Sequence, residues 1–194
     1  MFVEILGESY DINIKKLYLG NKGISQLPES IGKLRNLKEL HLEDNQLTTL
    51  PESIGKLRNL KELHLEDNRL TTLPESIGNL INLQYLSLYN NQLTTLPESI
   101  GRLINLKYLC LHNNQLNNLP TSILNIKKSL LMYVNSYEIN NLSTDTEFLI
   151  FNYLDEELKN LPIGLREIWI YNENKTLNKT LNHKLPFGCV VKYF

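Results

Sequence analysis

Apolar and polar residues follow a pattern along this chain that returns every 23 residues. The segments 33–55 and 56–78 carry the same residues except at Gln46 and Arg69. A constant period of this length indicates stacked structural units, because each unit buries its apolar side against its neighbours. The sequence therefore predicts one continuous stack of similar coils.

Each copy of the pattern predicts a short strand followed by a turn. Leu40 and Leu42 flank His41, an alternation that puts the leucines on one face of a strand and the histidine on the other. The LPESIG segment that follows favours a single helical or 3₁₀ turn with its isoleucine facing inward, because proline fixes φ and cannot donate to a strand ladder. Strands of successive coils, about 4.8 Å apart, are expected to form a parallel sheet.

Five copies begin at Ile14, Leu37, Leu60, Leu83 and Leu106 and follow LxxLxLxxNxLxxLPxxIGxLxx with few exceptions. This pattern resembles the leucine-rich-repeat family, and within it the 23-residue LPxxIGxL class of intracellular Ras-group-related and scribble-like proteins. The resemblance implies an α/β fold, a right-handed solenoid with a parallel β-sheet on its concave face and short 3₁₀ or helical turns on its convex face. It also implies a non-enzymatic protein–protein interaction module, used in scaffolding, signalling or host targeting.

The regular pattern begins at residue 14 and weakens after residue 128, which predicts three parts of one domain. We expect an N-terminal cap over 1–13, five regular repeats over 14–128, and irregular repeats with a C-terminal cap over 129–194. A cap is needed because the first coil has no neighbour that covers its apolar side. The apolar residues expected to form it are Phe2, Val3, Ile5 and Leu6.

The tail has two readings. Its segments LPIGLREIWIYNEN and LNKTLNHKLPFG resemble FNIP repeats of amoebae and giant viruses, which would continue the stack. The other reading places a short helix over 144–157, with Phe148, Leu149 and Phe151 on its buried side.

An asparagine stands at the ninth position of four repeats, where the chain must turn after the strand. Its amide can both donate to and accept from backbone groups that the turn would otherwise leave buried and unpaired. We therefore expect a structural ladder of Asn45, Asn68, Asn91 and Asn114.

The positions between the leucines, at three, five, seven and eight of each repeat, are expected to face outward and to carry the function. Repeats two and three place carboxylates and histidines there, and later repeats place aromatic residues there. Exposed aromatic residues with a polar rim suit a protein-binding surface, although strands also favour such residues for their own sake. The predicted partner-binding residues are Tyr18, His41, Glu43, His64, Glu66, Tyr85, Tyr89, Tyr108, His112, Tyr133 and Trp169.

Two catalytic alternatives arise on the same face. His41 and His64, with Glu43 and Glu66 beside them, could hold a divalent metal ion. Verbatim duplication of the repeat explains this adjacency without a metal, so we expect no metal and no cofactor. Cys110 and His112 are expected to point outward from one strand and could support thiol chemistry, but no third orienting group accompanies them. We therefore expect no enzyme, with a metal- or thiol-dependent catalyst as the alternative.

Composition restricts the partners further. A net charge of −1 argues against a nucleic-acid partner, and no apolar stretch approaches the ~20 residues that span a bilayer, so we expect no membrane contact. The two cysteines lie far apart and no signal peptide is expected, which favours a reducing, cytoplasmic setting. We also expect a monomer. The carboxylates of repeats two and three would steer a basic partner, whereas the charged convex face is assigned no function. A structural assembly subunit remains a further alternative.

Overall fold

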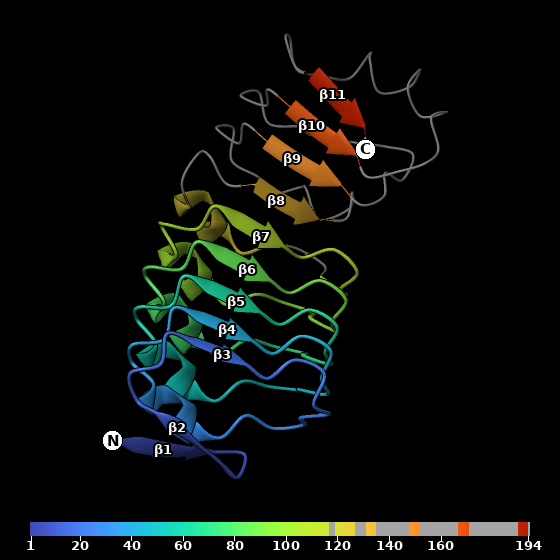
Figure 1. Ribbon diagram of the computed structural model, residues 1–194. Helices are drawn as coiled ribbons and strands as arrows, with labels where there is room; N and C mark the ends of the chain where they lie inside the picture. Colours follow the sequence, from blue (N-terminus) through green and yellow to red (C-terminus); the bar gives the residue numbers. More distant parts are fainter. Residues whose placement is uncertain (117–118, 127–130, 135–147, 152–166, 171–189, 194) are drawn as a thin grey trace.

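The computed structural model describes residues 1–116 and 119–126, and the backbone of the strands at 131–134, 148–151, 167–170 and 190–193. Figure 1 shows a ladder of strands along one side of the molecule and short turns along the other. A repeat of one strand and one turn produces this arrangement, which is the α/β solenoid that the sequence predicts.

The strands form one parallel sheet in which every pairing joins consecutive strands. The described residues contribute nine strands to it: β3 (Lys16–Tyr18), β4 (Glu39–His41), β5 (Glu62–His64), β6 (Tyr85–Ser87), β7 (Tyr108–Cys110), β8 (Leu131–Val134), β9 (Phe148–Phe151), β10 (Glu167–Ile170) and β11 (Val190–Tyr193). The register keeps residues 23 apart side by side from β3 to β8. Equivalent positions of successive repeats therefore form continuous rows across the sheet.

The predicted turn after each proline is a 3₁₀ turn. The turns are η1 (Glu29–Lys33), η2 (Glu52–Lys56), η3 (Glu75–Asn79), η4 (Glu98–Arg102) and η5 (Thr121–Asn125). Proline precedes each turn in an extended conformation, and its carbonyl accepts the first hydrogen bond of the turn. The core lies between the turns and the sheet, where Ile54, Ile77 and Ile100 are completely buried, as predicted.

Adjacent turns approach so closely that the glycine of IG is a packing requirement. A Cβ on Gly78 would lie 2.4 Å from the carbonyl oxygen of Ser99, and one on Gly101 would lie 2.2 Å from that of Ser122. The fifth repeat carries Leu124 at this position. At this position the fifth repeat thus departs from the residue that the close approach of the earlier turns requires.

The N-terminal end of the stack is covered by a hairpin of β1 (Phe2–Ile5) and β2 (Glu8–Asp11). Leu6 and Gly7 form its turn with φ of 53° and 81°, as a two-residue type I′ turn requires. Val3 and Ile5 are buried, but Phe2 and Leu6 are exposed. The prediction that all four apolar residues cover the first coil is thus wrong for Phe2, because alternate residues of a strand point to opposite faces, and for Leu6, because it lies in the turn of the hairpin.

The C-terminal strands correct one reading of the tail. β9 occupies 148–151 in parallel register with β8 and β10, so the alternative of a helix over 144–157 is wrong in that segment. Pairing through Ile150 places Trp169 in the same row as Tyr133 and Cys110. Most of the segments that resemble FNIP repeats, and any C-terminal cap beyond the strands, lie outside the described residues.

Candidate functional site

The outward face of β3–β7 carries a continuous row of aromatic rings. Tyr18 stacks on His41 with 4.6 Å between ring centroids, and His41 stacks on His64 at 4.3 Å. His64 then stacks on Tyr85 at 4.8 Å, and Tyr85 meets Tyr108 at 6.0 Å in a tilted arrangement. We call these five residues the aromatic row.

The sheet register produces this row. Parallel strands lie about 4.8 Å apart, which matches the separation of stacked rings. Tyr18, His41 and His64 occupy the fifth position of their repeats, whereas Tyr85 and Tyr108 occupy the third. At β6 the row changes from the fifth position of the repeat to the third, because the fifth position there holds the small Ser87. Ser87 is completely buried, although its position faces outward.

Cys110, like Ser87, is buried on this face, which corrects a prediction. The alternation along β7 predicts an exposed thiol, but Cys110 is only 7% exposed. Burial raises the pKa of this thiol to about 12, even though a hydrogen bond from Tyr85 acts in the opposite direction. Since the thiolate is the nucleophile, a buried thiol with so high a pKa is poorly suited to catalysis, and the thiol-dependent alternative loses its main support.

A second, shorter stack lies beside the aromatic row at the seventh position. The rings of Tyr89 and His112 are 4.9 Å apart and within 4° of parallel. Burial lowers the pKa of His112, so its imidazole is neutral at neutral pH. The two stacks together give the later repeats a rigid surface of ring edges.

The two histidines of the row have different electrostatic surroundings despite identical local sequences. Burial and the neighbouring His64 lower the pKa of His41, although Glu43 lies 3.7 Å from its Nδ1. Burial also disfavours the charged form of His64, but its carboxylate neighbours outweigh burial and raise its pKa. Glu66 lies 3.5 Å from its Nδ1, and Glu62 lies 3.8 Å from its Nε2. His64 is therefore the first of the pair to bind a proton.

The relative orientation of the His41 and His64 rings decides whether they could share a metal ion, as the catalytic alternative requires. The planes of His41 and His64 differ by 9°, so the lone pairs on their nitrogens run side by side and do not converge on one point. A tetrahedral ion requires converging ligands. Within the described residues, no group of three histidine, cysteine, aspartate or glutamate side chains is placed to hold a metal ion.

The asparagines at the ninth position form a buried ladder along one edge of the sheet. Asn68 donates through Nδ2 to the carbonyls of Leu42 at 2.9 Å and Leu65 at 3.1 Å, and its Oδ1 accepts from the backbone N–H of Leu47 at 3.0 Å. Asn45, Asn91 and Asn114 make the equivalent bonds. This row joins the coils and is not available to a partner.

The eighth position also has a structural explanation. Its residues have positive φ between 54° and 56°, and they are Asn21, Asp44, Asp67, Asn90 and Asn113. Aspartate and asparagine tolerate this conformation better than other non-glycine residues. The backbone conformation therefore accounts for the residue type at this position, whether or not the position also contacts a partner.

The turn side of the molecule has structural roles that sequence reasoning missed. Glu29 and Glu98 accept the backbone N–H of Ser53 at 3.2 Å and of Ser122 at 3.1 Å from the next coil. A second asparagine row ends repeats two to four, and each member donates to a backbone carbonyl of the preceding coil, as Asn59 does to Arg35 at 2.9 Å. These residues recur every 23 positions, and this recurrence is the feature of the sequence that could have indicated their structural role.

The predicted binding residues thus differ in accessibility. Tyr18 and Tyr108 are 59% and 40% exposed. The other residues that keep partial exposure are His41, Glu43, His64, Glu66, Tyr85, Tyr89 and His112. The side chains of Tyr133 and Trp169 lie outside what the structure describes.

Comparison with known families agrees with this architecture. A family described as a leucine-rich repeat region matches residues 12–87, and one described as leucine-rich repeats in two copies matches residues 81–125. Together they span 12–125, more than half of the 194 residues. No curated protein matches the sequence.

Two solved leucine-rich-repeat structures are similar to this chain, and both are longer than it. The leucine-rich-repeat ectodomain of the plant membrane receptor kinase GASSHO1/SCHENGEN3 from Arabidopsis thaliana, in complex with CASPARIAN STRIP INTEGRITY FACTOR 2, is 26% identical with a TM-score of 0.59; the match covers 94% of this chain and 24% of that one. A leucine-rich-repeat protein of Leptospira interrogans is 24% identical with a TM-score of 0.45, over 93% of this chain and 65% of that one. The chain spans less than two thirds of either relative. On its repeat pattern, its coil geometry and these family matches, the chain belongs to the leucine-rich-repeat family.

Proposed function

We propose that this chain is a non-enzymatic module that binds a partner protein through the outward face of β3–β7, centred on the aromatic row. The continuous stack of rings is the observation that carries the proposal. Stacking immobilises the rings before a partner arrives, so binding orders few side chains, and rigid aromatic residues are typical of interface hot spots.

The charges beside the row favour a partner with a basic surface. Glu43 and Glu66 lie next to the histidines on one side, and Glu62 lies on the other. Such carboxylates accelerate the approach of a basic partner, so the association rate should fall as salt is added. The similar leucine-rich-repeat ectodomain that has been solved in complex with CASPARIAN STRIP INTEGRITY FACTOR 2 supports a partner-binding role for the module. We further propose that the module acts as a monomer in the cytoplasm, in scaffolding, signalling or host targeting.

The test uses the exposed ends of the row. Tyr85 is half-buried over Ser87 and Cys110, so its removal would disturb packing; Tyr18 and Tyr108 are the better choices. Affinity capture from a cell lysate should recover a specific protein with the wild-type chain and lose it with Tyr18→Ala/Tyr108→Ala. Phe2→Ala is the matched control, because Phe2 is an exposed aromatic residue on β1, outside this sheet. Equal capture by both variants would refute the proposed surface.

A further inference from the structure

A second surface, independent of the aromatic row, lies where each 3₁₀ turn leads into the next strand. The segments 33–38 and 56–61 both read KLRNLK, and the equivalent segments 79–84 and 102–107 read NLINLQ and RLINLK. None of the four contains a carboxylate. We call the exposed cations of these segments, together with the preceding Lys15, the basic edge: Lys15, Lys33, Arg35, Lys38, Lys56, Arg58, Lys61, Arg102 and Lys107.

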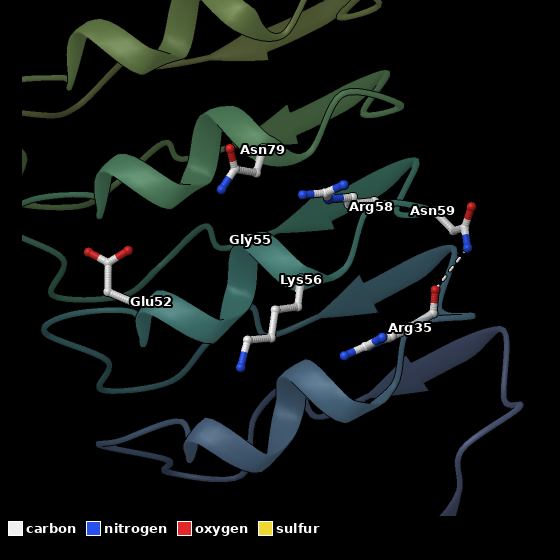
Figure 2. Close-up of a pocket in the computed structure, with 7 residues that line it drawn as sticks. All are labelled: Arg35, Glu52, Gly55, Lys56, Arg58, Asn59 and Asn79. Carbon is white, nitrogen blue, oxygen red and sulfur yellow. Dashed lines mark hydrogen bonds between the residues drawn. The ribbon is translucent and has the colours of Figure 1, made fainter.

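The cations of this edge are available to a ligand. Among the residues that the structure describes, the lysines in ion pairs are Lys16 and Lys22, and neither belongs to the basic edge. A shallow hollow of about 560 Å³ lies between the coils, lined by Arg35, Lys56 and Arg58. Glu52 is the carboxylate of this hollow, and it lies at the far end of η2 from Arg58 (Figure 2).

The edge is rigid and partly apolar. Asn59 ties its coil to the carbonyl of Arg35, and Asn82 does the same to Arg58 at 2.8 Å. In the two later repeats, the position of Arg35 and Arg58 is occupied by Ile81 and Ile104, which are 48% and 50% exposed. The same edge therefore presents cations on a fixed backbone in the early repeats and exposed branched aliphatic side chains in the later ones.

The opposite edge of the sheet is acidic. Glu43 and Asp44 follow β4, and Glu66 and Asp67 follow β5, at the ends of the strands remote from the basic edge. Glu39 and Glu62 begin β4 and β5 beside Lys38 and Lys61, but the nine cations outnumber them, so cations predominate at one edge of the sheet and carboxylates at the other. A negatively charged plane would attract the basic edge and repel the acidic one, which fixes the orientation of the molecule.

We propose that the basic edge docks on the surface of an anionic membrane, with Ile81 and Ile104 inserted among the headgroups. Six of the nine cations are lysines, which are depleted at protein–protein interfaces but suit a fluid anionic surface that requires no fixed geometry. The four segments carry no aromatic side chain on which a nucleic-acid base could stack. Docking in this orientation leaves the aromatic row free, so the module would hold its partner beside the membrane.

This contact is peripheral. No helix in the part of the chain that the structure describes is long and apolar enough to cross a membrane. The sequence-based expectation of no membrane contact rests on the lack of a spanning segment, and a surface contact needs none. Lysine and arginine near an anionic leaflet contribute about 1 kcal/mol each, so a cluster of this size is sufficient for reversible binding.

Co-sedimentation with lipid vesicles tests the proposal. The wild-type chain should sediment with vesicles that contain about 30 mol % phosphatidylserine and stay in solution with phosphatidylcholine alone, and the bound fraction should fall as salt is raised. Arg58→Glu should weaken the binding about tenfold or more, since it reverses one charge of the edge. Arg69→Glu is the matched control: it makes the same charge change on an exposed arginine of the next repeat, beside the acidic edge. Ile81→Ser/Ile104→Ser should reduce binding several-fold at unchanged charge.

Three results would overturn the proposal. One is failure of the wild-type chain to sediment with the anionic vesicles. Another is an equal loss of binding in Arg58→Glu and Arg69→Glu, which would indicate an effect of net charge and not of this edge. The third is binding of polyglutamate or of RNA that displaces the chain from vesicles at low concentration, which would assign the edge to a macromolecular polyanion. None of these measurements depends on the partner of the aromatic row.

Discussion

The imidazole rings of His41 and His64 lie 4.3 Å apart and within 9° of parallel, on equivalent positions of two repeats that are almost identical in sequence. Their surroundings nevertheless push their pKa values in opposite directions. Burial and His64 lower the pKa of His41, whereas three carboxylates overcome burial and raise that of His64. The difference arises from position in the stack and not from the repeat itself.

The first prediction is the order of protonation. In an NMR titration, the imidazole resonances of His64 should change at a pH above the ordinary histidine value of about 6.5, and those of His41 below it. Glu66→Gln should bring the two midpoints closer, because it removes the carboxylate nearest to His64 Nδ1. The same midpoint for both histidines in the wild-type chain would contradict the assigned surroundings.

The second prediction concerns stability and pH. A histidine whose pKa is raised by folding stabilises the protein below its unfolded pKa, and this contribution is lost as pH rises through the folded pKa. A histidine whose pKa is lowered has the opposite effect and destabilises the fold on acidification. Urea denaturation at pH 5 and pH 8 should therefore show that His64→Gln loses stability mainly at the lower pH. His41→Gln should instead reduce the loss of stability that acid causes, and the same sign for both variants would refute the prediction.

The third prediction separates the two asparagine rows. Asn68→Ala leaves the carbonyls of Leu42 and Leu65 and the N–H of Leu47 buried without their partner, so it should lower the free energy of unfolding by about 3 kcal/mol or more. Asn82→Ala removes one exposed hydrogen bond to Arg58 and should lower it by less than about 1 kcal/mol. Urea denaturation of both variants measures the difference, and similar losses would contradict the structural role of the buried row.

The fourth prediction tests the glycine contact between turns. Gly78→Ala places a Cβ 2.4 Å from the carbonyl oxygen of Ser99, so adjacent coils must separate. We expect a loss of about 1–3 kcal/mol, the range for overpacked sites. Gly7→Asn is the control, because a Cβ there meets nothing within 4 Å and asparagine tolerates the positive φ. A wild-type denaturation midpoint for Gly78→Ala would show that the turns can move apart freely.

The sequence predicts the fold well for a physical reason. The repeats bury equivalent leucines and share the proline, and the first four also share the glycine, so a misleading residue in one copy is outweighed by the other copies. Ile54, Ile77 and Ile100 are inward as the period requires. The fifth repeat departs from the pattern at Leu124, and the close contact of Gly101 with the next turn explains why earlier repeats carry glycine there.

The binding face is less predictable, because side chains from neighbouring strands decide which outward positions are accessible. Alternation correctly assigns Ser87 and Cys110 to the outward face, yet the ring of Tyr85 lies in the row that covers them. The volume of one side chain thus sets the exposure of another one coil away. Sequence periodicity predicts the face of the sheet from which a side chain projects. It does not predict which neighbouring side chains a large ring covers.

The last prediction tests whether the ring of Tyr85 covers the thiol of Cys110. In a Cys189→Ser background, Cys110 should react with iodoacetamide far more slowly in the folded chain than in urea, because the thiol is buried and its pKa is raised to about 12. Tyr85→Ala should accelerate the reaction at least tenfold, as removal of the ring admits both water and reagent. Tyr108→Ala, on the next strand, serves as the comparison. If both variants react equally fast, general loosening of the sheet and not the cover of Tyr85 controls access to the thiol.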